Sequence, residues 1–410
     1  MRTLNAAAQL RAMFAENPDA FSVVAAPGKG MALVSIKGAE RGFNERADAL
    51  VRAADGTDLN EFWDEANAAV NARNAQRNRI VDQLTYRVTE MAEKVTVPSG
   101  GEDFEVASEY GLPKAVKTSP GNTFWRGYDF NFYDLAVRFT WLYIAEADVR
   151  DLRSQINVAL EADNRLLFNR VMRTLFNPIN GAGITDENLP VTVYKFYNGD
   201  GEVPPAVGSN TFLGTHSHYL TTQGASASAT LVPASVDAMQ THLDHHGYTM
   251  LAGYKKVLWV NTQEYNIIKT WRVANGASWD FIPDDTRSGG GVWVPDGQGG
   301  RYVGAPQGTV QGQVGTYGPW HVVLEDYIPA GYLAGIVTGG PDNLTNPIGL
   351  REHKNAAFRG LKLIPGNRND YPLVESFFQR GIGTGIRQRG AGIIMQVSGN
   401  AAYTVPAIYA

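Results

Sequence analysis

The feature that most constrains the fold is a long extended hairpin followed by one long amphipathic helix. Gly and Pro mark the hairpin from about Val95 to Phe132, and the helix is predicted from about Ala145 to Phe176. An isolated two-stranded ribbon is only marginally stable in water, and so long a ribbon cannot bury its own two faces. The hairpin therefore needs another surface to lie on, and a second copy of the chain is one such surface.

One continuous apolar stripe runs along the predicted helix. Its spacings are 3, 4, 4, 7, 4 and 4 residues, which is the pattern of a helix with one buried face. Some 30 residues at ~1.5 Å each make a rod of roughly 45 Å, and Asn177-Pro178 ends it. The stripe consists of Val149, Leu152, Ile156, Leu160, Leu167, Val171 and Leu175.

The region before the hairpin is predicted to contain two helices and an extended arm. Residues 3–16 form a short helix that Asn17-Pro18 stops, and residues 21–58 alternate between short apolar stretches and polar turns. A second helix covers about residues 59–84. Its middle is almost wholly polar, so we expect a bend or a break there.

The hairpin has two strand-like arms, Glu102 to Tyr110 and Phe124 to Phe132, around a turn-rich tip. In the second arm the alternation places Phe124, Arg126, Tyr128, Phe130 and Phe132 on one face. A further strand, Leu135 to Tyr143, shows the clearest alternation in the chain.

The second half of the chain mixes helices and strands. A helix is predicted over Pro233 to His246, and a buried strand over Lys256 to Asn261, after which Thr262 caps a helix that runs to Trp271. Residues 285–318 are predicted as a long irregular loop, and strands follow over 320–337 and 358–363. Two closing strands, Phe377 to Ile386 and Gly392 to Val397, flank the basic turn Arg387 to Gly390.

Composition narrows the class of protein. The 410 residues are 44% hydrophobic, which is typical of a globular chain. The net charge of −5 argues against a nucleic-acid reader, which usually carries a basic surplus. The chain has no Cys, hence no disulfide, thiolate zinc site or Cys nucleophile. No run of 18 apolar residues predicts a membrane span.

The strongest enzymatic motif is a set of histidines. His216 and His218 share a face if their segment is a strand, and His242 and His246 share a helical face, so the four are a plausible metal seat. No Glu stands between the second pair as in a metalloprotease, and His245 and His246 also suit a helix C-terminus. The Gly-rich stretches lack the Lys-Ser/Thr of a phosphate-binding loop. We therefore favour polar loop and helix-end histidines, with a metal-dependent enzyme as the alternative.

The order of these elements resembles the major capsid proteins of tailed bacteriophages, with the Hong Kong 97-type fold. The most characteristic local pieces are Phe377 to Val397, the unit from Lys255 to Trp271, and the strand Trp320 to Asp326. The resemblance implies an α+β subunit with an N-terminal arm, an extended β-hairpin loop, a spine helix, a mixed-sheet peripheral domain and an α/β axial domain. The expected division is residues 1–94 for the arm and helix, 95–132 for the extended loop, 133–232 with 346–410 for the peripheral domain, and 233–345 for the axial domain.

The resemblance also implies a structural function rather than an enzymatic one, without cofactor or metal. Family members form hexamers and pentamers that tile an icosahedral shell around double-stranded DNA, held without sequence-specific contacts. The shell is assembled in the host cytoplasm, and the protein ends in the virion capsid. Scaffold, portal and decoration proteins are the expected partners, and no membrane is involved. An encapsulin-like compartment shell has the same fold and is the nearest alternative.

In such a shell the extended loop lies over a neighbouring subunit, and exposed aromatic side chains act as interface anchors. Some family members also join this loop to a neighbour by a Lys–Asn isopeptide bond, for which Asn343, Asn346, Asn355 and Asn367 are candidate partners. We favour solvated tip charges for the two lysines concerned. The predicted assembly interface is Lys114, Lys117, Trp125, Arg126, Tyr128, Phe130, Phe132, Arg387 and Arg389.

Overall fold

The structure is a computed structural model of the chain. It describes residues 53–75, 79–96, 106–107, 109, 111–112, 123–184, 190–204, 216–249, 254–284, 292–294, 301–303, 312–365 and 373–410. The predicted helix over 3–16, most of the arm over 21–58 and most of the first hairpin arm lie outside these ranges. Two compact units divide the chain: residues 1–73, 134–160 and 362–379 form the first, and residues 74–133, 161–361 and 380–410 form the second. The four-part domain division stays a prediction.

Helices and segments of three strands make up the described part of the first unit. Helix α2 (Leu59–Ala75) begins after Asp58, whose carboxylate accepts the Asn60 N–H at 2.8 Å. Its buried Phe62 and Trp63 pack against Phe139 of β4 (Asn131–Thr140). The predicted strand over 135–143 is therefore right as far as Thr140 and wrong beyond it.

The strand stops because Thr140 caps a helix. Its hydroxyl accepts the Tyr143 N–H at 3.2 Å, and α4 (Trp141–Glu146) follows. Ala145 therefore belongs to this short helix, and the long helix α5 runs over Val149–Phe176. Its predicted stripe is confirmed at five of the seven positions, since Val149, Leu152, Ile156, Val171 and Leu175 are buried, and the other two are partly buried.

The predicted helix over 59–84 is divided, as its polar middle indicated. Helix α2 ends at Ala75 and α3 covers Arg79–Leu84. Strand β1 (Thr85–Val88) follows directly and joins a sheet of order β1-β15-β17-β16, in which β4 also pairs with β17. The other strands are β15 (Ile348–Arg351), β16 (Leu361–Pro365) and β17 (Leu373–Ile386).

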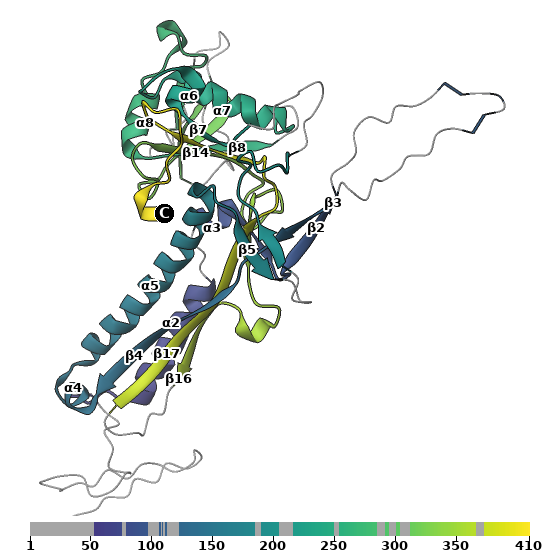
Figure 1. Cartoon of the computed structure of the whole chain (residues 1–410). Coiled ribbons are helices and arrows are strands. Elements are labelled where there is room, and N and C mark those ends of the chain that lie inside the picture. The colour runs from purple at the N-terminus through teal and green to yellow at the C-terminus, as the bar shows by residue number, and fades with distance from the viewer. Residues whose placement is uncertain are drawn as a thin grey trace, which may run out of the picture. The chain divides into compact units, whose positions relative to one another are not determined.

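A sheet of seven strands forms the centre of the second unit, in the order β7-β18-β14-β8-β13-β12-β9. Strands β7, β14 and β8 of this sheet are labelled in Figure 1. Helices α6 (Thr222–Ser226), α7 (Pro233–His245) and α8 (Thr262–Ile268) lie beside the sheet. Val236, Met239 and Leu243 of α7 are fully buried, which confirms their predicted apolar face. The strands are β7 (Tyr219–Thr221), β8 (Lys255–Val260), β9 (Phe281–Pro283), β12 (Gln313–Tyr317), β13 (Trp320–Leu324), β14 (Tyr332–Thr338) and β18 (Gly392–Gln396).

Two details of the second unit differ from the sequence-based expectations. The cap of α8 is Asn261, whose side chain accepts the Gln263 N–H at 3.1 Å, and not Thr262. The region over 285–318 is not one irregular loop, because β12 and the antiparallel pair β10 (Val292–Val294) and β11 (Arg301–Val303) fall within it. A Gly-rich composition hides strands this short.

The two closing strands are confirmed as strands, but they do not pair with each other. Strand β17 pairs with β15, whereas β18 pairs with β14 and β7. The turn between them carries the chain from one sheet to the other. Gly392 sits against the ring of Phe196, where a Cβ atom would overlap the ring, so the entry into β18 requires a residue without a side chain.

The hairpin has a paired base. Strands β2 (Ala92–Thr96) and β3 (Thr123–Gly127) are antiparallel, with Thr96 opposite Thr123. The predicted single strand over 124–132 is wrong, because the ladder breaks between β3 and β4. There Tyr128 donates its N–H to Met91 O at 3.0 Å, and Asp129 donates its own to Thr384 O at 3.2 Å. A further small pair, β5 (Gly181–Ile184) and β6 (Pro190–Val193), lies next to β3.

Replacing Gly383 by Ala should destabilise the subunit by about 3 kcal/mol or more, the upper end of the cost of overpacking. A Cβ atom at Gly383 would overlap the backbone carbonyl of Asp129, which cannot rotate away. Urea denaturation of the unassembled subunit measures the difference. Gly399→Ala is the control, since its Cβ atom would meet only Ala229 at 3.6 Å. Equal midpoints for the two variants would contradict the packing described here.

Candidate functional site

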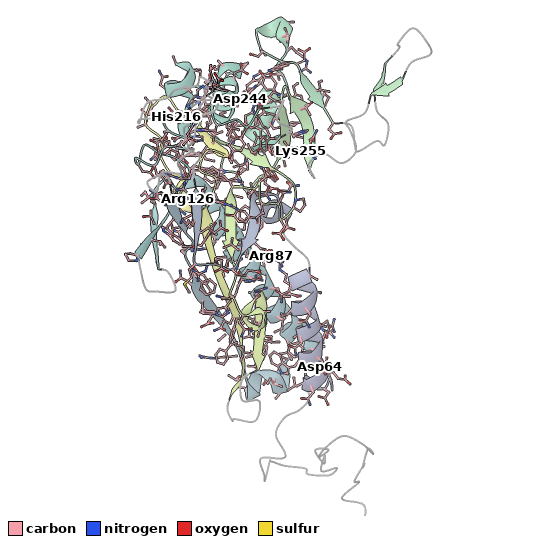
Figure 2. The ribbon with its side chains drawn as sticks, turned by 90° about the vertical axis from the view of Figure 1, so that its right-hand side faces the viewer. Asp64, Arg87, Arg126, His216, Asp244 and Lys255 are labelled. Atoms are coloured by element: carbon pink, nitrogen blue, oxygen red, sulfur yellow. The ribbon has the colours of Figure 1, made fainter. Side chains whose placement is uncertain are left out.

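The second unit carries a buried network of charges at the base of the hairpin. Arg389, in the turn after β17, forms an ion pair with Asp200, and its Nε and Nη1 donate to the carbonyl oxygens of Lys195 and Glu202, each at 2.9 Å. Arg126 of β3 forms an ion pair with the Glu202 carboxylate. The network therefore ties β3, the segment after β6 and the β17–β18 turn together. Arg126 is labelled in Figure 2.

Aromatic rings complete this network. The guanidinium carbons of Arg126 and Arg389 lie 4.9 and 4.6 Å from the centre of the Tyr194 ring, so both cations make cation–π contacts with this ring. Although burial acts to raise the pKa of Asp200, hydrogen bonds from Arg389 and Asn180 hold that pKa below its ordinary value. Asp200 is thus held as the anion that Arg389 requires.

The segment just after β3 is anchored as firmly. The side chain of Tyr128 is fully buried, and its hydroxyl lies 2.7 Å from the Tyr86 hydroxyl and donates to Glu93 Oε2 at 3.0 Å. Arg351 donates to the Tyr128 carbonyl oxygen at 3.0 Å. Asp129 accepts the Thr384 N–H at 2.5 Å and pairs with Arg170. The base of the hairpin is therefore fixed by side chains from several distant parts of the unit.

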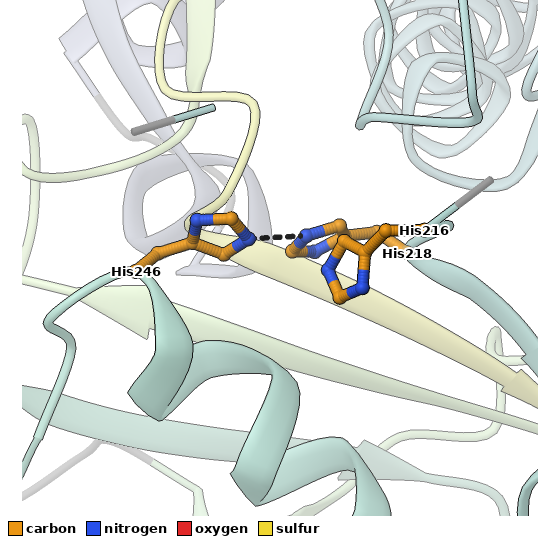
Figure 3. Close-up of side chains that lie close together, drawn as sticks. All are labelled: His216, His218 and His246. Atoms are coloured by element: carbon orange, nitrogen blue, oxygen red, sulfur yellow. Dashed lines mark hydrogen bonds between the residues drawn. The ribbon is translucent and has the colours of Figure 1, made fainter. Parts of the chain in front are cut away.

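The histidines form a second cluster. His216 and His218 precede β7, and His246 is the cap residue that ends α7 (Figure 3). Their ligand nitrogens all lie within 4.8 Å of one another, as a metal site requires. The sequence grouped His242 with these three histidines as a plausible metal seat, but His242 is not part of the group that the structure brings together. Its ring stacks on His216 with centroids 4.6 Å apart, but its Nδ1 bonds the Ala238 carbonyl of its own helix at 2.8 Å.

Burial governs the charge of these rings. It lowers the pKa of His216 to about 4 and the pKa of His218 well below its ordinary value, and the neighbouring histidines add to both shifts. The rings of His216 and His218 are accordingly neutral at pH 7, which is the form that binds metal ions.

Comparison with known proteins identifies the chain. No protein-family model matches it, and no curated protein does. A solved structure from Mycobacterium phage Patience is 34% identical, with a TM-score of 0.67 over 94% of this chain and 98% of that chain. The chain belongs to the major capsid proteins of tailed bacteriophages.

Two more distant structures are also similar to this capsid protein. The mature capsid of bacteriophage PhiM1 is 10% identical, with a TM-score of 0.43 over 78% of this chain and 87% of that one. The holo-SrpI encapsulin of Synechococcus elongatus is 12% identical, with a TM-score of 0.40 over 83% and 98%. The similarity to the phage Patience structure confirms the predicted α+β fold and the structural role in a virion capsid. Among the described residues, no helix combines the length and the apolar character needed to cross a bilayer.

The residues predicted at the assembly interface of the capsid protein fall into different environments. Trp125 is 54% exposed and Phe132 is 48% exposed, whereas Tyr128, Arg126 and Arg389 are buried within the chain. The expectation that Tyr128 lies on an exposed ribbon is wrong, because the chain bends inward after β3. Phe130 and Phe132 pack edge to face, at 5.1 Å between centroids. Lys114 and Lys117 lie outside the described residues.

The candidate asparagines for a cross-link also lie in different environments. Asn346 is fully buried, and its amide donates to the carbonyl oxygens of Thr85 and Gly340 at 2.8 and 2.9 Å. Asn355 caps a short helical turn by accepting the Ala357 N–H at 2.9 Å. Asn343 accepts the Thr345 N–H at 2.9 Å at an exposed turn, and Asn367 lies outside the described residues. Asn346 is thus committed to folding, which removes it as a cross-linking partner.

Sequence reasoning missed the acidic partners of the basic turn. Asp200 and Glu202 follow β6 by a few residues and carry no motif, and they are almost 190 positions from Arg389 in the chain. Arg389 is therefore buried within the subunit, and its place at an assembly interface stays a prediction. The side chain of Arg387, in contrast, is partly exposed, and its Nε lies 3.4 Å from Glu93 Oε2.

Arg389→Gln should destabilise the capsid protein by about 3 kcal/mol, because it removes the buried donor to the carbonyl oxygens of Lys195 and Glu202 and the cation that pairs with Asp200. Arg387→Gln is the matched control two residues away, and a half-exposed ion pair is worth at most about 1 kcal/mol. Urea denaturation of the unassembled subunit compares the two. If both variants unfold at the wild-type midpoint, the network does not support the fold.

The free energy of unfolding should fall as the pH drops from about 6.5 toward about 4. A histidine in the unfolded chain has a pKa of ~6.5, and the folded values of His216 and His218 lie below it. In this window the unfolded chain binds protons that the folded chain does not. Urea midpoints at pH 7.0, 6.0 and 5.0 in chelator test this, and the decline should be shallower in His216→Phe. A wild-type midpoint that rises on acidification would contradict the sign.

Proposed function

We propose that the hairpin of this capsid protein lies on a neighbouring subunit and holds the shell together. This proposal rests on the contrast between the base of the hairpin and the residues that connect its two strands. The base is fixed by β2–β3 pairing, Arg126 and Tyr128. Beyond it, Val106 and Leu112 are 96% and 97% exposed.

Exposed apolar side chains on a fixed support are typical of a protein–protein interface. Large apolar groups in water cost free energy, and a partner surface that covers them recovers about 25 cal/mol per Å². Trp125 is half exposed on β3 and extends the apolar surface toward the base. Another copy of the chain is the partner that a capsid provides.

The assembly proposed is a closed shell of hexamers and pentamers that encloses double-stranded DNA. A net charge of −5 suits a container that encloses DNA without binding it tightly, because tight binding needs many phosphate contacts from Lys and Arg. Trp125, Phe130, Phe132 and Arg387 are the candidate anchors whose side chains reach the surface, together with Lys114 and Lys117 at the tip. The role of each is a proposal, as are the scaffold, portal and decoration proteins as partners.

Replacing residues 111–122 by a short Gly-Ser turn should leave a folded subunit that does not assemble. The deleted residues lie beyond the paired base, so the fold keeps its contacts while the proposed interface is lost. Size-exclusion chromatography and negative-stain electron microscopy measure assembly, and circular dichroism measures folding.

Two point variants serve as controls for the deletion. Trp125→Ala should reduce the yield of particles without a change in melting temperature, because its side chain is half exposed. Tyr128→Ala should instead lower the melting temperature, because its side chain is fully buried. Normal particles from the loop deletion would overturn the proposal.

A further inference from the structure

Five of the seven histidines of the chain gather in one place that shell assembly does not explain. The rings of His216, His218, His242, His245 and His246 are linked by centroid distances of 4.6 to 6.3 Å. They come from two segments, the one that enters β7 and the last turn of α7. So dense a group of imidazoles is a feature of metal sites, for which the neutral imidazole is a common ligand.

The orientation of His218 is fixed as metal-binding histidines usually are. Its Nδ1 donates to the Gly392 carbonyl oxygen at 2.7 Å, so its Nε2 carries the lone pair. This Nε2 points at His246 Nε2, 2.9 Å away (Figure 3). In metal-bound imidazoles the ring nitrogen that does not bind the metal usually donates to a group such as a backbone carbonyl. This hydrogen bond fixes both the tautomer and the orientation of the ring.

We propose that His216, His218 and His246 together bind one borderline divalent cation, with zinc as the best fit. Imidazole ligands suit Zn²⁺, Cu²⁺ and Ni²⁺. Two nitrogens at ~2.0–2.1 Å from a tetrahedral zinc ion are ~3.3 Å apart. The three ligand atoms here lie within 4.8 Å of one another, so small ring rotations bring them to this spacing.

The ion replaces the hydrogen bond between His218 and His246. His246 then carries its proton on Nδ1 and offers Nε2 to the metal, a change of tautomer without a change of charge. Three imidazoles leave one tetrahedral position for water. His218 is fully buried, so the site belongs to the interior of the unit rather than to a patch of surface histidines.

The site has a structural role in joining two segments. Strand β7 pairs with β18 over only three residues, and α7 ends at the His246 cap. An ion held by His216, His218 and His246 links these segments directly. Because it binds the folded unit, it stabilises that unit by a free energy that rises with the logarithm of the ratio of its concentration to the dissociation constant.

The test uses the full-length, chelator-treated subunit and Zn²⁺ alone. Isothermal titration calorimetry should give one ion per chain, and Zn²⁺ should raise the melting temperature. His246→Phe removes a proposed ligand and keeps a ring, and should weaken binding by more than about 100-fold, since even supporting residues cost 10–100-fold. His242→Phe is the matched control on the same helix and should change the affinity by less than about threefold, because His242 lies outside the ligand group and its Nδ1 bonds the Ala238 carbonyl oxygen of its own helix.

His216→Phe is the second ligand variant, chosen because His216 is only partly buried and tolerates replacement better than His218. It should weaken Zn²⁺ binding as much as His246→Phe does. Because the two histidines differ in burial, the same loss of affinity in both variants indicates loss of a ligand rather than loss of the fold. No Zn²⁺ binding by the wild type, or binding by both ligand variants with the affinity of the wild type, overturns the proposal. A loss confined to His242→Phe overturns the ligand set.

Discussion

Two guanidinium groups and the carboxylates that neutralise them meet at the base of the hairpin, and the rest of the second unit is arranged around this network. Arg126, Arg389 and Glu202 are buried, so removing the partner of any of these three leaves a charge in a place that water cannot reach, which costs several kcal/mol. Asp200 reaches solvent. Arg126 comes from β3, Glu202 and Asp200 from the segment after β6, and Arg389 from the turn between the two main sheets. The same network therefore sets where the hairpin starts and where β17 gives way to β18.

Glycines make room for the segment that this network holds. A Cβ atom at Gly349 or Gly385 would overlap Tyr128, and one at Gly383 would overlap the Asp129 carbonyl. The absence of side chains on β15 and β17 lets the backbone after β3 approach the sheet closely. Tyr128 can then reach Tyr86 and Glu93. Close packing and buried charge thus act on the same few residues.

A fixed base with exposed apolar residues beyond it is consistent with the place of this chain in a capsid. A subunit that assembles must keep apolar surface exposed until a neighbour covers it, and a rigid base limits the entropy lost on docking. The histidine cluster acts elsewhere, at the junction of α7 and β7. Assembly and the proposed metal site therefore depend on different residues and can be tested separately.

The sequence by itself determined the elements whose evidence is local. The stripe of α5, the apolar face of α7 and the buried strand β8 follow from periodicity within 6 to 28 residues, and all three are confirmed. The order of these elements was also sufficient to indicate the capsid family. These features depend on neighbours in the chain, whose spacing the sequence states directly.

Only the tertiary structure decided which side chains meet. Arg389 and Asp200 are almost 190 residues apart, and nothing near either of them shows that one neutralises the other. The inward bend at Tyr128, the separate sheets of β17 and β18, and the selection of His216 over His242 as a partner of His246 have the same origin. Each depends on the free energy of burying groups from distant segments together, and that free energy has no signature in local periodicity.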